Sequence, residues 1–178
     1  ISRSARVSHQ FNKISKDSSL WKSWGKLYIE GMKVPTEFLN YDVQRGITEL
    51  CLVRCEILPP MKRPLNLRAL GLHLTTGDKT FVNEILTTHS MEKIDFREDM
   101  ISDSDISWFI KKLPEIGSHL KNLNLESTLP EECGDLENIE LIVDSCVGLE
   151  ELNLSGNRLK NEAIDYLCEN LTPSILKL

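Results

Sequence analysis

The sequence contains no run of about 18 consecutive apolar residues, so we expect no membrane-spanning helix. Basic residues do not predominate either: 21 Lys and Arg stand against 27 Asp and Glu, which gives a net charge of −6 and a pI near 5.3. This balance disfavours a nucleic-acid-binding surface, which is normally basic. No basic segment followed by an apolar stretch marks a signal peptide. We therefore expect neither nucleic acid nor membrane among the partners.

Clustered metal ligands are missing as well. The five cysteines are odd in number and scattered, and no two have the C-x-x-C spacing of a zinc or redox site. The four histidines are equally dispersed. We expect no metal site and no cofactor, and we interpret the cysteines as reduced, structural thiols of an intracellular protein.

Sequence motifs of catalysis are also absent. Residues 75–80 include Gly-Asp-Lys-Thr but lack the G-x-x-x-x-G-K-[ST] spacing with which a loop holds phosphate. The acidic segment 95–105 lacks the glycine and the final glutamate of an EF-hand loop. No histidine lies at motif spacing from a nucleophile or a paired carboxylate. The sequence therefore predicts a protein that is not itself an enzyme.

The pattern that organises the chain is found at residues 149–159, Leu-Glu-Glu-Leu-Asn-Leu-Ser-Gly-Asn-Arg-Leu. Its leucines and Asn157 match L-x-x-L-x-L-x-x-N-x-L, the strand-and-turn unit of a leucine-rich repeat. One unit cannot bury its leucines alone, so it predicts copies of itself on either side.

Related segments recur along the chain. With Leu152 as the reference position, the equivalent residues are Leu50, Leu70, Ile94, Leu123 and Leu178. The intervals are 20, 24, 29, 29 and 26 residues, within the roughly 20–29 typical of this repeat. Apolar residues also stand three before and two after each reference: Ile47, Leu67, Met91, Leu120, Leu149 and Ile175, and Leu52, Leu72, Phe96, Leu125 and Leu154.

We therefore predict an α/β fold, a leucine-rich-repeat solenoid over residues 47–178. It would have a parallel inner sheet and a helical or loop outer face. Because the sequence begins with Ile and ends within a repeat, we expect it to be a piece of a longer protein, truncated in its last repeat.

Small polar residues or cysteine stand five positions after each reference. In a stacked repeat this side chain turns inward at the end of the strand, where buried backbone groups need hydrogen-bond partners. Asn, Asp and Thr supply such bonds, and Cys supplies them weakly. The residues concerned are Cys55, Thr75, Asp99, Thr128 and Asn157.

Segments between the expected strands indicate the outer layer. Apolar residues with helical spacing predict helices at 78–88, 102–113, 135–146 and 161–171. The prolines of segment 59–64 disfavour a helix in the first interval, where we expect a loop. Segment 25–46 is interpreted as a linker and an irregular first repeat, with a possible short strand at Leu27, Ile29, Met32 and Val34.

Residues 1–24 have a different pattern, a short amphipathic helix followed by Leu20, Trp21 and Trp24. Segment 7–21, which ends in Asp17-Ser-Ser-Leu20-Trp21, resembles the second half of an F-box, in which an aromatic residue precedes D-x-x-L-W. We expect 1–24 to be this C-terminal half of an F-box-like helical module, a remnant that caps the solenoid. An alternative is an ordinary N-terminal cap.

An F-box followed by leucine-rich repeats resembles the substrate receptors of SCF-type cullin-RING ubiquitin ligases. The resemblance implies an F-box-binding adaptor, a cullin and a protein substrate as partners, in the nucleus and cytoplasm. The receptor would contribute proximity and orientation for ubiquitination and degradation. Adaptor contacts are expected at Val7, Phe11, Ile14, Leu20 and Trp21, unless some of these, Trp21 above all, pack inward against the first repeat.

Substrate contacts are expected on the concave face of the solenoid. Strand residues alternate between core and surface, so the exposed rows can be identified from the repeat register. The candidate substrate-binding residues are Glu49, Lys93, Asp95, Arg97, Asn124, Glu126, Glu151 and Asn153. This polar surface suits a protein or peptide, although each residue could be only a solvated strand position. The second hypothesis is a non-catalytic cytosolic leucine-rich-repeat scaffold or regulator unrelated to ubiquitin.

Overall fold

The computed structural model describes residues 25–35, 47–58, 67–75, 86, 91–97 and 103–178. The F-box-like segment, with Val7, Phe11, Ile14, Leu20 and Trp21, lies outside the described residues. Asp99, the expected loop at 59–64 and all of the expected helix 78–88 except Leu86 also lie outside them.

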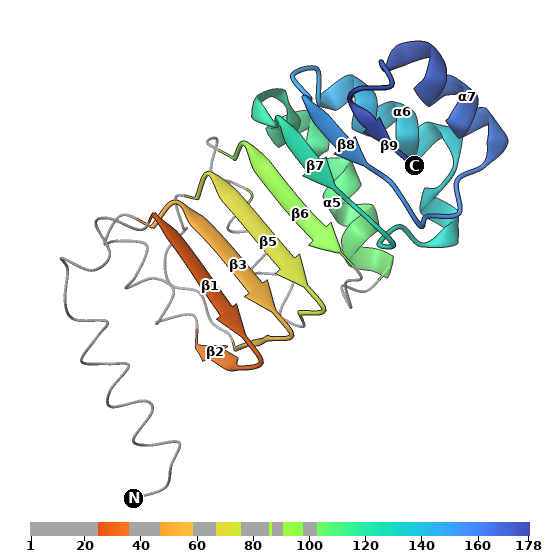
Figure 1. Cartoon of the computed structure of the whole chain (residues 1–178). Coiled ribbons are helices and arrows are strands. Elements are labelled where there is room, and N and C mark those ends of the chain that lie inside the picture. The colour runs from red at the N-terminus through yellow and green to blue at the C-terminus, as the bar shows by residue number, and fades with distance from the viewer. Residues whose placement is uncertain (1–24, 36–46, 59–66, 76–85, 87–90, 98–102) are drawn as a thin grey trace, which may run out of the picture.

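A seven-stranded parallel sheet forms one layer of the fold (Figure 1). The strands lie side by side in the order in which they occur in the sequence, and each strand is parallel to its neighbours. The strands are β1 (Lys26–Glu30), β3 (Glu49–Val53), β5 (Ala69–His73), β6 (Lys93–Arg97), β7 (Asn122–Asn124), β8 (Glu151–Asn153) and β9 (Leu176–Lys177).

The register of this sheet aligns the predicted reference residues, with one exception. Leu50, Leu70, Ile94, Leu123 and Leu152 lie side by side on successive strands. The prediction of Leu178 as the last reference is wrong, because Leu176 pairs with Leu152. Residues 176 and 178 have the same parity in a strand, so alternation does not distinguish them. A turn immediately precedes β9, and in it Ile175 N–H donates a hydrogen bond of 3.0 Å to Thr172 O. The strand that follows this turn has Leu176, not Leu178, beside Leu152.

The sheet begins one strand earlier than the repeats that the sequence predicted. Leu27 of β1 lies beside Leu50, and Ile29 lies beside Leu52. The expected strand does not continue to Val34, because Gly31 adopts a φ of 66° and ends it. Beyond this turn, β2 (Lys33–Pro35) pairs in parallel with β4 (Glu56–Leu58) in a separate two-stranded sheet.

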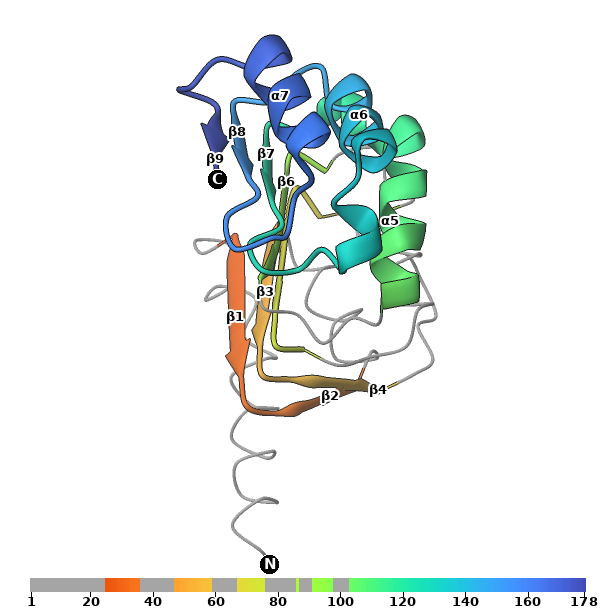
Figure 2. The ribbon, with the colours of Figure 1, turned by 90° about the vertical axis from the view of Figure 1, so that its right-hand side faces the viewer.

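Helices cover one face of the sheet over its later strands (Figure 2). They are α5 (Asp103–Ile116), α6 (Leu136–Ser145) and α7 (Asn161–Asn170), and short 3-10 turns occupy Gly117–His119 and Glu131–Cys133. The predictions at 102–113, 135–146 and 161–171 are confirmed, although α5 extends three residues further. Asp135 begins α6 by accepting a hydrogen bond of 3.1 Å from Asn138 N–H. No helix in these described ranges is long and apolar enough to span a membrane.

The core lies between the sheet and the helical layer. Alternate strand residues such as Leu52 and Leu72 are completely or almost completely buried there. Phe96 of β6 contacts Phe109 of α5 edge to face, with ring centroids 5.2 Å apart. Burying a leucine or phenylalanine side chain contributes about 1.5–3 kcal/mol, so this continuous apolar layer is the main source of stability.

Four of the five predicted inward-turning residues hydrogen-bond the backbone at the strand ends. Thr75 Oγ donates to Leu52 O at 3.0 Å, and Thr128 Oγ donates to Phe96 O at 2.8 Å. Cys55 Sγ lies 3.5 Å from Ile29 O. Asn157 satisfies the most groups, because Nδ2 donates to two carbonyls and Oδ1 accepts from two N–H groups. Each side chain links one strand end to the preceding one.

The residue just before each of these side chains has a left-handed backbone. The six described residues with this conformation are Gly25, Gly31, Arg54, Leu74, Ser127 and Gly156. All except Gly25 occupy the position four after the reference. Gly31 and Ser127 donate N–H hydrogen bonds of 2.9 Å to the next strand end, at Val53 O and Ser155 O. At Arg54, Leu74, Ser127 and Gly156 the left-handed residue turns the chain so that the next side chain points inward, whereas Met32 after Gly31 is exposed.

Candidate binding surface on the open face of the sheet

The face of the sheet opposite the helices, which we call the open face, carries the predicted candidate residues. The strand register arranges it in three rows. The first row is Lys26, Glu49, Ala69, Lys93, Asn122 and Glu151. The second is Tyr28, Cys51, Gly71, Asp95, Asn124, Asn153 and Lys177. The third is Glu30, Val53, His73, Arg97, Glu126 and Ser155, of which Glu126 and Ser155 follow the ends of their strands.

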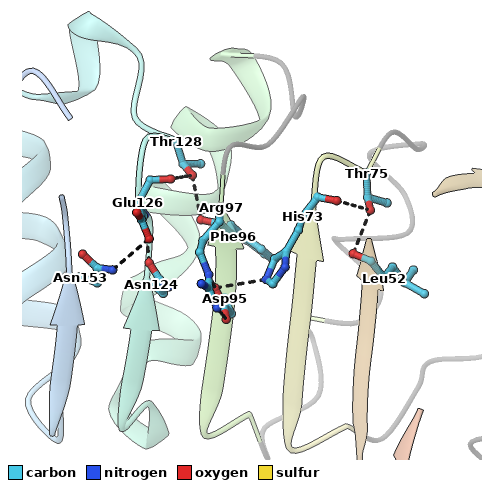
Figure 3. Close-up of polar contacts among 10 residues, drawn as sticks. All are labelled: Leu52, His73, Thr75, Asp95, Phe96, Arg97, Asn124, Glu126, Thr128 and Asn153. Carbon is cyan, nitrogen blue, oxygen red and sulfur yellow. Dashed lines mark hydrogen bonds and ion pairs between the residues drawn. The ribbon is translucent and has the colours of Figure 1, made fainter. Parts of the chain in front are cut away.

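An ion pair between Asp95 and Arg97 dominates the centre of the open face (Figure 3). Arg97 Nε donates to Asp95 Oδ1 and Arg97 Nη2 donates to Oδ2, both at 2.8 Å. Asp95 is buried, with 7% of its surface exposed. His73 Nε2 lies 3.4 Å from Asp95 Oδ1, although Nε2 makes no well-aligned hydrogen bond within the described chain.

The surroundings of Asp95 keep its carboxylate ionised. Burial alone would raise its pKa, but the two hydrogen bonds from Arg97, together with the nearby His73 side chain, hold this pKa well below its usual range. The same bonds raise the pKa of the Arg97 guanidinium. At the centre of the open face, the negative charge of Asp95 and the positive charge of Arg97 therefore neutralise each other.

Small side chains separate Asp95 from the earlier strands. Gly71 lies between Cys51 and Asp95 in the second row, and a Cβ at this position would lie 3.1 Å from Cys51 Sγ. Burial, followed by the charge of Asp95, raises the pKa of the Cys51 thiol. Because only the thiolate is strongly nucleophilic, this environment disfavours a reactive cysteine.

Charged side chains at the β1 edge are paired with one another. Lys26 Nζ lies 2.7 Å from Glu49 Oε2, and Arg68 Nη2 lies 3.5 Å from Glu49 Oε1. Glu30 pairs with Arg54 and accepts a hydrogen bond of 3.1 Å from Tyr28 Oη. The bonds from Arg54 and then Tyr28 lower the pKa of Glu30. Such exposed pairs contribute little to stability but neutralise this edge.

The opposite half of the open face is rich in amides. Glu151 pairs with Lys177 and accepts a hydrogen bond of 3.0 Å from Asn122 Nδ2, and these contacts lower its pKa. Asn153 Nδ2 lies 3.4 Å from Glu126 Oε2. Asn124 Oδ1 accepts from Glu126 N–H at 3.1 Å, a local turn that fixes the amide. Side-chain amides offer both donors and acceptors to a polypeptide.

All eight predicted candidate residues share the open face, but the structure joins only some of them. Asp95 contacts Arg97, and Glu126 contacts both Asn124 and Asn153. Glu49, Lys93 and Glu151 lie in the first row and form no hydrogen bond or ion pair with the other candidates among the described residues. The candidate set omitted Lys26, Tyr28, Glu30, His73 and Lys177. The alternation of Leu27 and Ile29 was the signal that could have identified the β1 residues.

Groups of three or more Asp, Glu, His or Cys placed to hold a metal ion do not occur among the described residues. The described part of the open face carries ion pairs and amide hydrogen bonds. Such groups recognise polar ligands by complementary charge and hydrogen bonding.

The sequence matches no family model and no curated protein.

Proposed function

We propose that this chain is the substrate-recognition subunit of an SCF-type cullin-RING ubiquitin ligase. Residues 1–24 would bind the F-box-binding adaptor, and residues 47–178 would form a leucine-rich-repeat solenoid that holds the substrate. Among such receptors, the order of segments resembles that of S-phase kinase-associated protein 2. The observation that carries the proposal is the D-x-x-L-W segment at Asp17–Trp21, which directly precedes a parallel sheet with one polar face that none of the described helices covers (Figure 2).

The repeat interpretation is supported by three recurring features of the described strands. Reference residues from Leu27 to Leu152 share one register. Left-handed residues recur at the fourth position after the reference, and inward-turning polar side chains or cysteine recur at the fifth. Such repetition is typical of a solenoid, in which each unit contacts mainly its neighbours.

The substrate interpretation is supported by the character of the open face. Its ion pairs and amides can bind a protein surface or peptide without any covalent step. A receptor of this kind accelerates ubiquitination by holding substrate lysines near a ubiquitin-conjugating enzyme that another subunit recruits. The adaptor contacts would be Val7, Phe11, Ile14, Leu20 and Trp21.

Co-purification with the adaptor and cullin tests the proposal. The chain, extended by whatever upstream sequence its gene encodes, would be co-expressed with both partners. We expect stable recovery of the complex, and we expect the double variant Phe11→Ala/Trp21→Ala to lose it while the circular dichroism spectrum stays unchanged. The matched control is Lys93→Ala/Glu126→Ala on the open face, which should retain the adaptor.

Two results would contradict the proposal. One is a well-folded protein that recovers neither partner. The other is recovery that the Phe11 and Trp21 substitutions leave intact, because the F-box-like segment would then not carry the contact.

A further inference from the structure

The charged side chains of the open face nearly all neutralise one another. Oppositely charged atoms lie within ion-pair distance in the pairs Lys26–Glu49, Arg54–Glu30, Arg97–Asp95 and Lys177–Glu151. A charge that is already paired contributes less to the binding of another charged group, because binding must compete with the existing partner. The remaining unpaired charges therefore indicate what a ligand must supply.

Lys93 and Glu126 are the two exceptions among the described residues of the open face. Lys93, at the start of β6, is exposed and forms no ion pair in this part of the chain; it acts on Glu151 of the same row only through its field. Glu126 follows β7 and has only the 3.4 Å contact with Asn153 Nδ2 and the field of nearby Arg97. One cation and one anion without an ion pair among the described residues thus lie at the start of β6 and just after the end of β7.

The register determines how far apart these two charges lie. Lys93 lies opposite Asn122 in the register. Glu126 is four residues further along, in the turn after β7, where Leu125 N–H and Ser127 N–H still donate hydrogen bonds to Asn153 O and Ser155 O at the end of β8. Four residues at about 3.3 Å each, with a strand spacing of about 4.8 Å, give a separation on the order of 14 Å. A free amino acid is too short to contact both charges. A polypeptide can do so.

A third group lies along the same diagonal. Asn124, opposite Asp95 in the register, uses Oδ1 to accept from Glu126 N–H, whereas Nδ2 has no hydrogen-bond partner within the described chain. An amide donor at this place can bond a peptide carbonyl. Beside Asn124, Arg97 and Asp95 are joined by two hydrogen bonds, so their charges are already paired with each other.

We propose that the strip formed by Lys93, Asn124 and Glu126 binds an extended peptide that carries an acidic and a basic residue four positions apart. In an extended chain such residues point to the same side and lie about 13 Å apart, which matches the strip. The acidic residue pairs with Lys93, the basic residue pairs with Glu126, and Asn124 holds a main-chain carbonyl between them. This inference rests on the proposed function, since it specifies the substrate that the open face selects.

Selection of displayed peptides tests the inference. A phage library of random peptides of about nine residues would be selected on the full chain and on the double variant Lys93→Glu/Glu126→Lys, which keeps the net charge. We expect the wild type to enrich peptides with opposite charges four positions apart. The double variant should enrich the reversed order and bind wild-type-selected peptides about tenfold more weakly in fluorescence anisotropy.

A matched control separates the strip from general electrostatics. Lys33→Glu/Glu56→Lys reverses an exposed ion pair of 2.7 Å on the small sheet and should select the same peptides as the wild type. The inference is overturned if no peptide is enriched, if enriched peptides lack the charge pair, or if the double variant selects unchanged peptides while its circular dichroism spectrum is native. Co-purification with the adaptor is measured separately. Failure of the proposed function appears as loss of adaptor recovery, whereas failure of this inference appears as loss of the charge pair in the selected peptides.

Discussion

Arg97 donates two hydrogen bonds of 2.8 Å to the carboxylate of Asp95, two residues earlier on the same strand. The pair is asymmetric, because 44% of the Arg97 side chain but only 10% of the Asp95 side chain is exposed. Asp95 therefore depends on its partner more than Arg97 does. A buried carboxylate that loses its cation keeps the cost of desolvation without the compensating attraction.

Replacing Arg97 by Gln should lower the free energy of unfolding by about 1–3 kcal/mol, the usual cost of an unsatisfied buried group. Urea denaturation at pH 7 measures this change. Lys93→Gln on the same strand is the matched control and should change stability by less than about 0.5 kcal/mol, because Lys93 forms no ion pair in the described chain. Equal effects of the two substitutions would mean that the pair with Asp95 does not stabilise the fold.

The contribution of Asp95 should depend on pH in a defined direction. Its folded-state pKa lies below the ordinary value of 3.8, so the folded state releases the proton more readily than the unfolded state. The stabilisation is complete above about pH 5 and is lost as the pH falls below 3.8 toward the folded-state pKa. Urea denaturation of wild type and Asp95→Asn between pH 7 and pH 3 measures it. The difference in unfolding free energy should shrink on acidification, and a constant difference would contradict the assignment.

Asn157 should be the most sensitive of the inward-turning residues. Its side chain makes four hydrogen bonds of 2.8 to 3.0 Å with backbone groups of two strand ends. Asn157→Ala leaves these groups unsatisfied and should lower the unfolding free energy by about 2–4 kcal/mol. Asn170→Ala, which removes one exposed bond to Tyr166 O, is the control and should have little effect. Comparable losses in the two variants would argue against the stabilising role of Asn157.

The sequence predicted the features of the fold that depend on periodicity. The apolar references from Leu50 to Leu152 identified the strands and their register, because a slip by one residue would expose every leucine. The inward positions of Thr75 and Asn157 followed from the need to satisfy backbone groups at a strand end.

Features that depend on local backbone geometry were not predicted. Arg54 and Leu74 have φ values of 51° and 49°, although neither residue type favours the left-handed region. Each follows the end of a strand and precedes an inward-turning side chain, Cys55 or Thr75, that bonds the preceding strand. The register of Leu176 depends on the turn before β9, which the alternation of apolar residues does not specify.

The candidate surface was predicted as a set of positions but not as a set of interactions. Alternation places Lys93, Asp95 and Arg97 on one face, yet it does not show that Arg97 bonds Asp95 while Lys93 stays unpaired in the described chain. These pairings depend on side-chain conformations and on His73 of the neighbouring strand.

Gly156 combines two requirements that substitutions can separate. Its φ of 73° disfavours any side chain, and a Cβ would lie 2.3 Å from Ser127 Oγ, which follows strand β7. Gly31 has a similar φ of 66° but no atom within 4 Å of the equivalent position. Gly31→Ala should therefore lower the unfolding free energy by about 1 kcal/mol through backbone strain alone.

Gly156→Ala should lower the free energy of unfolding more than Gly31→Ala does, by about 2–3 kcal/mol in total, because the contact with Ser127 adds to the backbone strain. In a Ser127→Gly background the contact is removed, so the cost of Gly156→Ala should fall to that of Gly31→Ala. Urea denaturation of the four proteins in this double-mutant cycle gives the coupling directly. If the cost of Gly156→Ala is the same in both backgrounds, Ser127 adapts without penalty and only the left-handed backbone requires glycine at 156.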